Sequence, residues 1–241
     1  MIEIQNLTKY YGDFKAVDNI SLTINDGEIV GFIGSNGAGK STTIKMMTGI
    51  IHPDEGDVLL NGFSIKHPKI NLLAKKQFGF VPDTPDMFLR LTGIQYLNFI
   101  CDIYNVPKDV RAEKISKLAD EFHIKNSLND RILNYSHGMR QKINVVAVLL
   151  YEPSIWILDE PMVGLDPEAA DLLKRKMKEH AAKGNIVFMS THVISMAEAL
   201  CDKVIVIKHG KVLFYGTIEE LKANKDESME KILLELIEKE G

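Results

Sequence analysis

The stretch from Gly34 to Ser41, GSNGAGKS, constrains this chain more than any other feature of its sequence. It matches the pattern G-x-x-x-x-G-K-[ST] at every position. The glycines let the backbone turn so that several N–H groups converge on phosphate oxygens. An apolar run from Glu28 to Gly34 precedes the loop, as a buried strand would, and Thr42 to Ile50 has a helical pattern. We therefore predict a strand, a phosphate-binding loop and a helix, in that order.

The side chains of this loop predict which ligand it holds. Lys40 places a cation beside the β- and γ-phosphates of a nucleotide, and the Ser41 hydroxyl can ligate Mg²⁺. The helix that follows points its positive end at the same anion. We therefore expect a nucleoside triphosphate and Mg²⁺ to bind here. The expected contacts are Gly34, Ser35, Asn36, Gly37, Ala38, Gly39, Lys40, Ser41 and Thr42.

A second cluster of chemistry-bearing residues follows the apolar run Ile155 to Leu158, which reads as a buried strand. Two acids, Asp159 and Glu160, come directly after it. An aspartate at the end of such a strand can hold the Mg²⁺ shell. Glu160 is placed to polarise an attacking water. The two clusters together predict hydrolysis of the bound nucleotide.

The order of the remaining patterns predicts an α/β fold. Residues 1–60 read as short strands broken by turns, and residues 82–135 carry apolar residues at helical spacing. Strand patterns at 186–189 and 204–207 alternate with helical ones, as at 169–182. Strands that alternate with helices imply a parallel sheet at the core.

Composition excludes several classes of protein. The formal net charge is −4, so there is no bulk cationic field for nucleic acid. Two cysteines, Cys101 and Cys201, cannot form a disulfide scaffold, which fits a reducing cytoplasm. The longest apolar run, Val145 to Tyr151, is far shorter than the roughly 20 residues that a membrane span needs. The first residues lack the pattern of a signal peptide. We expect any action at a membrane to require a partner.

Three further segments stand in a fixed order around the second cluster: Tyr135 to Gln141 (YSHGMRQ), Gly164 to Pro167 (GLDP) and Ser190 to His192 (STH). With these, the chain resembles the ATP-binding subunit of an ATP-binding cassette (ABC) transporter over nearly its whole length. The resemblance implies a P-loop NTPase (RecA-like) α/β fold with an antiparallel β subdomain and a helical insert. It implies one domain, with its core at 1–83 and 141–220, the insert at 84–140 and a C-terminal helix at 221–241.

The resemblance also implies roles for residues outside the two clusters. Tyr11 would stack on adenine, and His192 would contact the γ-phosphate as a catalytic partner of Glu160. Ser136, Gly138 and Asp166 would contact ATP held by a second subunit. Two positions depart from the family pattern. His137 replaces one of the two glycines of the signature segment. Asp83 stands where a Gln or Glu usually follows the proline, and we place it beside the metal.

The implied function is an ATPase that powers a membrane transporter of the ABC-2-like or Ecs-like exporter type. Its expected partners are an integral membrane permease and a second cassette, identical or different, at the cytoplasmic face of the membrane. One alternative is a soluble ABC ATPase that acts on ribosomes or nucleic acid. Another is a regulatory GTPase, but Asn224 to Glu227 places the aspartate one position too early for a base-reading motif.

Overall fold

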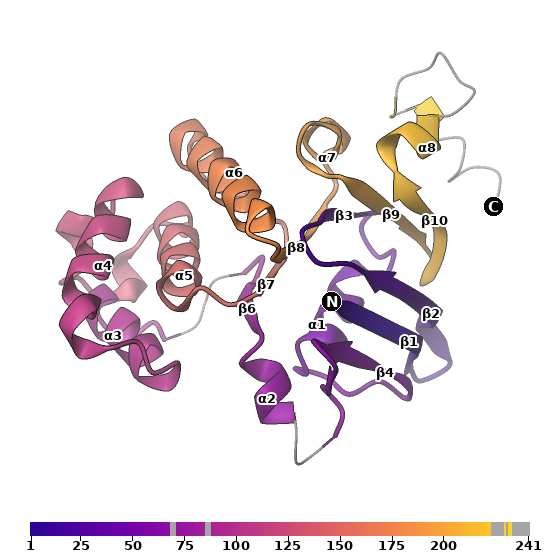
Figure 1. Ribbon diagram of the computed structural model, residues 1–241, viewed down its shortest axis with the longest axis horizontal. Coiled ribbons are helices and arrows are strands. Elements are labelled where there is room, and N and C mark those ends of the chain that lie inside the picture. Colours follow the sequence, from indigo (N-terminus) through magenta and orange to yellow (C-terminus); the bar gives the residue numbers. More distant parts are fainter. Residues whose placement is uncertain (68–70, 85–87, 223–228, 230, 233–241) are drawn as a thin grey trace.

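The computed structural model describes residues 1–67, 71–84, 88–222, 229, 231 and 232. Figure 1 shows three parts side by side: a group of helices, a central sheet with its own helices, and a second sheet around the N-terminus. The central sheet lies between the other two parts.

The central sheet has six strands in the order β10-β9-β3-β8-β7-β6. Strands β9, β3, β8, β7 and β6 run parallel, and β10 is antiparallel to β9. Every residue of β3, β7 and β8 is buried, because helices or a second sheet cover both faces of a parallel sheet. The strands are β3 (Ile29–Ile33), β6 (Phe78–Val81), β7 (Ile155–Leu158), β8 (Ile186–Thr191), β9 (Lys203–Lys208) and β10 (Lys211–Thr217).

The second sheet is antiparallel, in the order β2-β1-β4-β5. In β1, Ile2 and Ile4 are buried while the side chain between them is not, which is the alternation expected of a half-covered strand. The predicted antiparallel β subdomain is therefore confirmed. Its strands are β1 (Ile2–Tyr11), β2 (Phe14–Ile24), β4 (Glu55–Leu60) and β5 (Phe63–Ser64).

The helices divide between the central sheet and the helical insert. Helix α1 (Lys40–Met47) follows the phosphate loop, and α3, α4 and α5 form the group at one side of the molecule (Figure 1). The expected boundary at residue 140 falls inside α5, which joins the insert to the core. The other helices are α2 (Asn71–Lys75), α3 (Gly93–Ile103), α4 (Lys108–Glu121), α5 (His137–Tyr151), α6 (Pro167–Ala182), α7 (Ile194–Leu200) and α8 (Ile218–Lys222), with 3₁₀ turns at Lys125–Ser127 and Ile132–Asn134.

Two hydrophobic cores lie on opposite faces of the central sheet. One joins the sheet to α1 and the antiparallel sheet, and includes Ile44, Phe32 and Phe188. The other joins the sheet to the helical insert and α6. The sequence predicts an amphipathic stripe at the C-terminus. Met229 and Ile232 of that stripe are buried in the second core, whereas Leu233, Leu236 and Ile237 lie outside the described residues.

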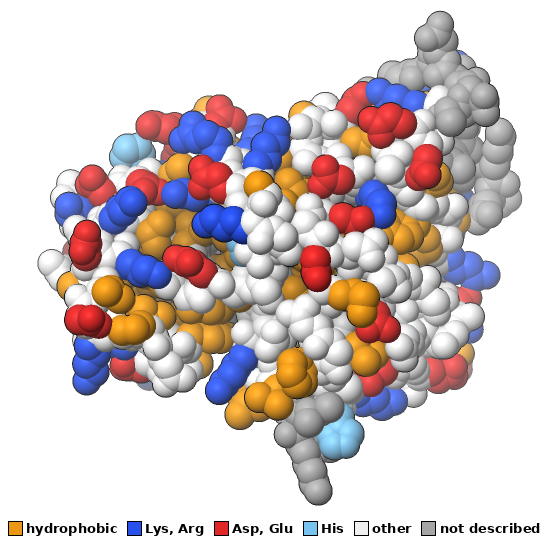
Figure 2. All heavy atoms as spheres, in the orientation of Figure 1, with side chains coloured by type: hydrophobic (Ala, Val, Ile, Leu, Met, Phe, Trp, Pro, Cys, Tyr) orange, Lys and Arg blue, Asp and Glu red, His pale blue; other side chains and the backbone are white. Residues whose placement is uncertain are grey.

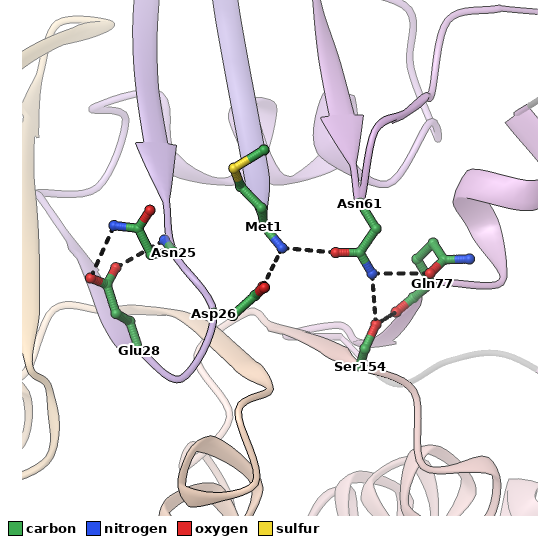
Figure 3. Close-up of polar contacts among 7 residues, drawn as sticks. All are labelled: Met1, Asn25, Asp26, Glu28, Asn61, Gln77 and Ser154. Carbon is green, nitrogen blue, oxygen red and sulfur yellow. Dashed lines mark hydrogen bonds and ion pairs between the residues drawn. The ribbon is translucent and has the colours of Figure 1, made fainter.

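A polar network links the two sheets at the start of the chain (Figure 3). The N-terminal ammonium of Met1 donates to Asp26 and, at 2.8 Å, to Asn61 Oδ1. Asn61 Nδ2 donates to Gln77 Oε1 at 3.0 Å and to Ser154 Oγ at 2.9 Å. Asn61 follows β4 of the antiparallel sheet, whereas Gln77 and Ser154 precede β6 and β7 of the central sheet. These contacts therefore fix one sheet relative to the other.

Two strands of the central sheet lie where the sequence pattern indicates none. Strand β6 has four residues, one of them Gly79, and β10 has a run of half-buried residues without alternation. A Cβ on Gly79 would stand 2.4 Å from a methyl carbon of Val148, so a glycine is required where α5 crosses the strand. Both strands lie at edges of the central sheet. At these positions the strand conformation depends on hydrogen bonding to one neighbouring strand more than on an alternating or apolar sequence pattern.

Candidate functional site

The phosphate-binding loop connects β3 to α1, as predicted. Lys40 Nζ donates to the carbonyl oxygens of Gly34, at 2.7 Å, and Ser35, at 3.2 Å. The ammonium is thus held inside the loop. Burial lowers the pKa of Lys40, while the carboxylates of Glu160 and Asp159 act to raise it. A buried cation without a carboxylate in direct contact is stabilised by an anion, so the Lys40 ammonium favours binding of an anion beside the loop.

Two glycines of the loop are required by close contacts. Gly39 has φ 109° and forms the N-cap of α1. A Cβ at Gly39 would lie 2.6 Å from the carbonyl oxygen of Ala16, and one at Gly34 would lie 2.5 Å from that of Ile207. The loop therefore packs against β2 and β9. This packing leaves Ser35, Asn36, Gly37 and Ser41 exposed, where their backbone N–H groups can meet phosphate.

The exposed side of the loop opens into a pocket of about 250 Å³, which we call the loop pocket. The predicted base-stacking residue Tyr11 lines it and is 52% exposed. Phe14, which the sequence patterns did not single out, also lines it. Of the contacts predicted within residues 34–42, all line the pocket except Gly34 and Ala38, both of which are buried in the loop. The lining residues are Tyr11, Phe14, Ala16, Ser35, Asn36, Gly37, Gly39, Lys40, Ser41 and Thr42.

Asp159 lies directly after β7 and is 6% exposed. Ser190 Oγ donates to Asp159 Oδ1 at 2.6 Å and accepts from the backbone N–H of Glu160 at 2.9 Å. Burial raises the pKa of Asp159, the Ser190 hydrogen bond lowers it, and the negative charge of Asp83 raises it. Asp83 itself is exposed after β6. The structure therefore brings Asp83, Asp159 and Lys40 within electrostatic reach of one another.

Glu160 and His192 meet across the ends of β7 and β8. His192 Nδ1 lies 3.0 Å from Glu160 Oε2. Glu160 adopts φ 47°, a left-handed conformation that is rare for residues other than glycine. The carboxylate is 14% exposed, whereas the imidazole is 55% exposed. The Glu160 carboxylate is thus mostly buried, and the His192 imidazole lies at the surface beside it.

The donors at this site fit a magnesium ion. Mg²⁺ is usually held by one or two protein ligands together with phosphate oxygens and water. Ser41 supplies an exposed hydroxyl and Asp159 a carboxylate, both near Lys40. Within the described ranges, no group of three or more His, Cys, Asp or Glu side chains forms an all-protein metal cage. This pattern suits an ion that arrives with a nucleotide.

The predicted contacts to a second subunit form a separate group. Ser136 caps α5, where its Oγ accepts from the Met139 N–H at 3.2 Å. A Cβ on Gly138 would lie 2.3 Å from the carbonyl oxygen of Gly164, and one on Gly164 would lie 2.4 Å from the His137 ring. The signature segment therefore packs on the Gly164–Pro167 loop of its own chain. Neither Ser136 nor Gly138 lines the loop pocket.

Asp166 makes two contacts within its own chain. Its Oδ1 accepts from the Ala169 N–H at 2.9 Å, which caps α6, and its Oδ2 lies 2.5 Å from Lys142 Nζ. The Lys142 ammonium is the main cause that lowers the pKa of Asp166. Helices α5 and α6 are thus tied together next to the signature segment.

The roles of Ser190, Lys142 and Phe14 were missed by sequence reasoning. Ser190 belongs to the Ser190–His192 segment that the sequence singles out, but its contact with the two acids after β7 was not predicted. Its partner Asp159, however, is 31 residues away, and only the pairing of β7 with β8 brings them together. Phe14 had a weaker signal, an aromatic residue just after the turn that follows Tyr11.

Comparisons with known proteins agree on one family. A family model described as ABC transporter matches residues 17–163. Over its whole length, the chain is 34% identical to the ABC-type transporter ATP-binding protein EcsA of Bacillus subtilis (strain 168), of which it covers 98%. It is 32% identical to the SkfA peptide export ATP-binding protein SkfE of the same strain, over 88% of this chain and 87% of that protein.

A solved structure has the same fold. The structure of an ATP-binding subunit of an ABC transporter superposes with a TM-score of 0.92 at 31% identity, covering 98% of this chain and 99% of that one. The fold thus agrees with what the sequence resemblance implies.

Proposed function

The chain belongs to the ATP-binding subunits of ABC transporters, which are ATPases, and from this premise we propose that it powers export by a membrane permease. The observation that carries the proposal is the convergence of three strand ends on one site. Lys40 follows β3, Asp159 and Glu160 follow β7, and His192 follows β8. These strands are neighbours in the central sheet, so cation, metal ligand and water-orienting groups face the same bound nucleotide.

Each side chain has a distinct task in the proposed hydrolysis. The loop N–H groups and Lys40 hold the phosphates, and Ser41 and Asp159 hold Mg²⁺, with Asp83 beside them. When bound, Mg²⁺ supplies positive charge that offsets the charge developing on the phosphate oxygens. Glu160 orients the attacking water and accepts its proton. His192 steadies the Glu160 carboxylate through their 3.0 Å contact and lies exposed where the γ-phosphate would be.

A second cassette completes the site in this proposal. Ser136 and Gly138 lie outside the loop pocket, and Ser136 is exposed. The N-terminus of α5 provides free N–H groups beside them, which favour an anion. ATP in the loop pocket of one subunit would therefore be covered by the signature segment of the other. Hydrolysis removes the bridging γ-phosphate, and the pair opens. The second cassette is an identical copy or a different chain.

An apolar surface near Asp83 supports a membrane partner. None of the helices that the structure describes is both long and apolar enough to cross a membrane. Five large apolar side chains on or near α2 and α3 are at least 40% exposed, and Figure 2 shows hydrophobic side chains gathered over these helices. Exposed apolar patches often mark binding surfaces. We assign this surface to a permease at the cytoplasmic face of the membrane. The residues are Leu72, Leu73, Phe88, Phe99 and Ile103.

Export, as opposed to import, is proposed from the relatives. SkfE is by its name an ATP-binding protein of peptide export. The cargo would be chosen by the permease, because the described part of this chain offers the nucleotide site and a docking surface and not a transport path.

Affinity purification tests this proposal. A tagged Glu160→Gln variant is purified from detergent-solubilised cells with ATP and Mg²⁺, and the proteins that co-purify are identified. We expect a polytopic membrane protein in near-equal amount. A second cassette beside it would indicate a heterodimer. The same purification without nucleotide serves as the control for ATP-dependent pairing. Ribosomal proteins or nucleic acid, without a membrane protein, would overturn the transporter assignment and leave the ATPase chemistry in place.

A further inference from the structure

A second pocket, which we call the helix pocket, lies between the helical insert and the core. Its lining includes Leu118 of α4, Leu149 of α5, Trp156 of β7 and His180 of α6. Its volume is about 360 Å³, larger than that of the loop pocket and within the range of roughly 300–1,000 Å³ typical of small-molecule sites. In Figure 2, hydrophobic side chains lie set back between α4 and α6, with basic and acidic side chains around them.

The charges that line the helix pocket do not balance. Four lysines and three glutamates line it. Two of the lysines form ion pairs of 3.0 Å and 2.9 Å with two of the glutamates. The other lining charges, Lys117, Lys183 and Glu179, have no ion-pair partner within the described part of the chain. One positive charge is therefore left over, and a ligand with a single acid group would balance it. The two ion pairs are Lys114 with Glu152 and Lys176 with Glu121.

Two buried ring atoms of the lining have no hydrogen-bond partner. Trp156 is 4% exposed and His180 is 7% exposed. Among the described residues, neither Trp156 Nε1 nor His180 Nε2 has a hydrogen-bond partner. Buried polar atoms are nearly always paired. The indole N–H is only a donor, so it needs an acceptor, and a carboxylate oxygen is one. A small shift of the rings would bring this donor to the surface of the pocket.

Lys183 places its positive charge near the same two rings. It follows the end of α6, one turn after His180. Burial, and then the charge of Lys183, lowers the pKa of His180 to about 4. One end of the helix pocket thus combines an unpaired cation with an unpaired N–H donor, which favours an anion. The side chains of Leu118 and Leu149 give the pocket an apolar surface as well.

We propose that the helix pocket binds a small organic anion that has an apolar body and one carboxylate. The acid group would lie beside Lys183 and the Trp156 N–H, and the apolar body would cover Leu118 and Leu149. Such a ligand would contact both the insert and the core.

This site is separate from the nucleotide site. The helix pocket and the loop pocket share no lining residue. Trp156 is the second residue of β7, whereas Asp159 and Glu160 follow the end of that strand. The proposal therefore does not depend on the function proposed above, and each can fail without the other.

Trp156 is the only tryptophan of the chain, so its fluorescence monitors this pocket directly. The protein is titrated with sodium octanoate, which has an apolar chain and one carboxylate. Acetate supplies the carboxylate alone, and 1-octanol supplies the apolar chain alone. We expect octanoate to change the Trp156 emission with a saturable curve. It should bind at least about tenfold more tightly than acetate because of its chain, and more tightly than 1-octanol because of its charge.

Lys183→Gln and Lys178→Gln form a matched pair of variants. Lys178 is another exposed lysine of α6, but it does not line the helix pocket. We expect Lys183→Gln to weaken octanoate binding about three- to fivefold, Lys183→Arg to retain it and Lys178→Gln to match the wild type. Octanoate should also raise the urea unfolding midpoint of the wild type more than that of Lys183→Gln. Equal midpoints without octanoate show that the variants are folded.

Three results would overturn the proposal. An unchanged Trp156 emission in octanoate would show that the helix pocket takes no such ligand. Equal binding of octanoate and 1-octanol would show that the acid group has no role. Equal weakening in Lys183→Gln and Lys178→Gln would show that octanoate responds to the overall charge of the protein and not to this pocket.

Discussion

Glu160 shows how a single residue is held for chemistry. Its φ of 47° costs about 1 kcal/mol or more relative to ordinary backbone. The Ser190 hydroxyl accepts the Glu160 N–H and at the same time donates to Asp159. One side chain of β8 therefore positions both acids that follow β7. The Glu160 carboxylate meets His192 Nδ1 at 3.0 Å, whereas the Asp159 carboxylate is held by Ser190.

Glu160→Gln is the substitution that tests the catalytic role of this residue. Glutamine keeps the size and the hydrogen-bonding reach of the side chain but cannot accept a proton from water. We expect ATP turnover to fall by a factor of about 100 or more, while ATP still binds. ATP-dependent dimerisation, followed by light scattering, should persist because the γ-phosphate stays in place. Lys40→Ala is the comparison that should lose ATP binding and dimerisation together. Turnover at the parent rate in Glu160→Gln would refute the assignment.

Gly138→Ala tests how closely the signature segment lies on the Gly164–Pro167 loop. The added Cβ would stand 2.3 Å from the Gly164 carbonyl oxygen, so the loop must move. We expect unfolding free energy in urea to drop by about 1–3 kcal/mol. Gly184→Ala is a suitable reference, since Gly184 has φ 83° but open space around it, and backbone strain alone should cost about 1 kcal/mol. An unchanged stability of Gly138→Ala would contradict the close contact.

At the scale of single residues, motif spacing could predict those functional residues whose role depends on residue type and on position next to a strand. Sequence patterns predict the phosphate loop, Asp159 and Glu160, because each of these roles needs a particular residue type at a fixed place after a strand. Ser190, Lys142 and Phe14 could not be assigned in this way. Their roles come from partners on other elements, such as Lys142 on α5 and Asp166 before α6. Serine, lysine and phenylalanine are also common enough that their identity alone indicates nothing.

At the scale of elements, the buried strands were the most predictable. Every residue of β3, β7 and β8 is buried because both faces of the sheet are covered, and Ile186 to Met189 of β8 form an apolar run. Edge strands β6 and β10 are not buried at every residue, and a sequence pattern cannot report which strand will be their neighbour. The order β3-β8-β7-β6 depends on long-range pairing. That order, more than any single element, brings the site residues together.

The contact between β7 and α6 makes folding depend on pH. Trp156 of β7 and His180 of α6 stack with their ring centroids 4.1 Å apart. Burial, helped by the Lys183 charge, lowers the pKa of His180 to about 4. Below the unfolded value of about 6.5, the unfolded chain binds a proton that the folded chain does not. The free energy of unfolding therefore falls as pH drops from 6.5 toward 4, and is fully retained above 6.5.

His180→Gln should remove this part of the pH dependence. Between pH 7.5 and pH 5, we expect the wild type to lose about 2 kcal/mol more unfolding free energy than the variant. Urea denaturation at both pH values measures the difference. His52→Gln is the control, because His52 is exposed. Its replacement should leave the change in unfolding free energy between pH 7.5 and pH 5 as it is in the wild type. Equal slopes in His180→Gln and the wild type would show that His180 is not held neutral.

At the scale of the whole molecule, the nucleotide site depends on how the two sheets are placed. The loop pocket is shared between them, since Tyr11, Phe14 and Ala16 come from the antiparallel sheet and the phosphate loop follows β3. In the proposed binding mode, the base and the phosphates would thus be held by different parts of the fold. Any device that fixes one sheet on the other also fixes the shape of the pocket, even from a distance.

The Asn61 network of Figure 3 is such a device, and Asn61→Ala tests it. The change removes both hydrogen bonds that Nδ2 donates, to Gln77 and Ser154, and one that Oδ1 accepts from the N-terminus. It also places alanine at φ 50°. We expect unfolding free energy to fall by about 2 kcal/mol, with faster hydrogen exchange in β1 and β4. Asn61→Gly removes the same hydrogen bonds but places no strain on the backbone at this φ. The difference between the two variants therefore measures the backbone strain separately from the lost hydrogen bonds.

The same pair of variants relates the network to the nucleotide. If the network fixes the sheets, Asn61→Gly should weaken ATP binding, where the base and the phosphates contact different sheets, and should spare tripolyphosphate, which contacts the loop alone. Asn6→Gly is the matched control, because Asn6 has φ 49° and its Nδ2 donates to Asn19 Oδ1 at 3.0 Å within the antiparallel sheet. Equal ATP affinity in Asn61→Gly and Asn6→Gly would show that the hydrophobic core between the sheets, without the network, sets their relative position.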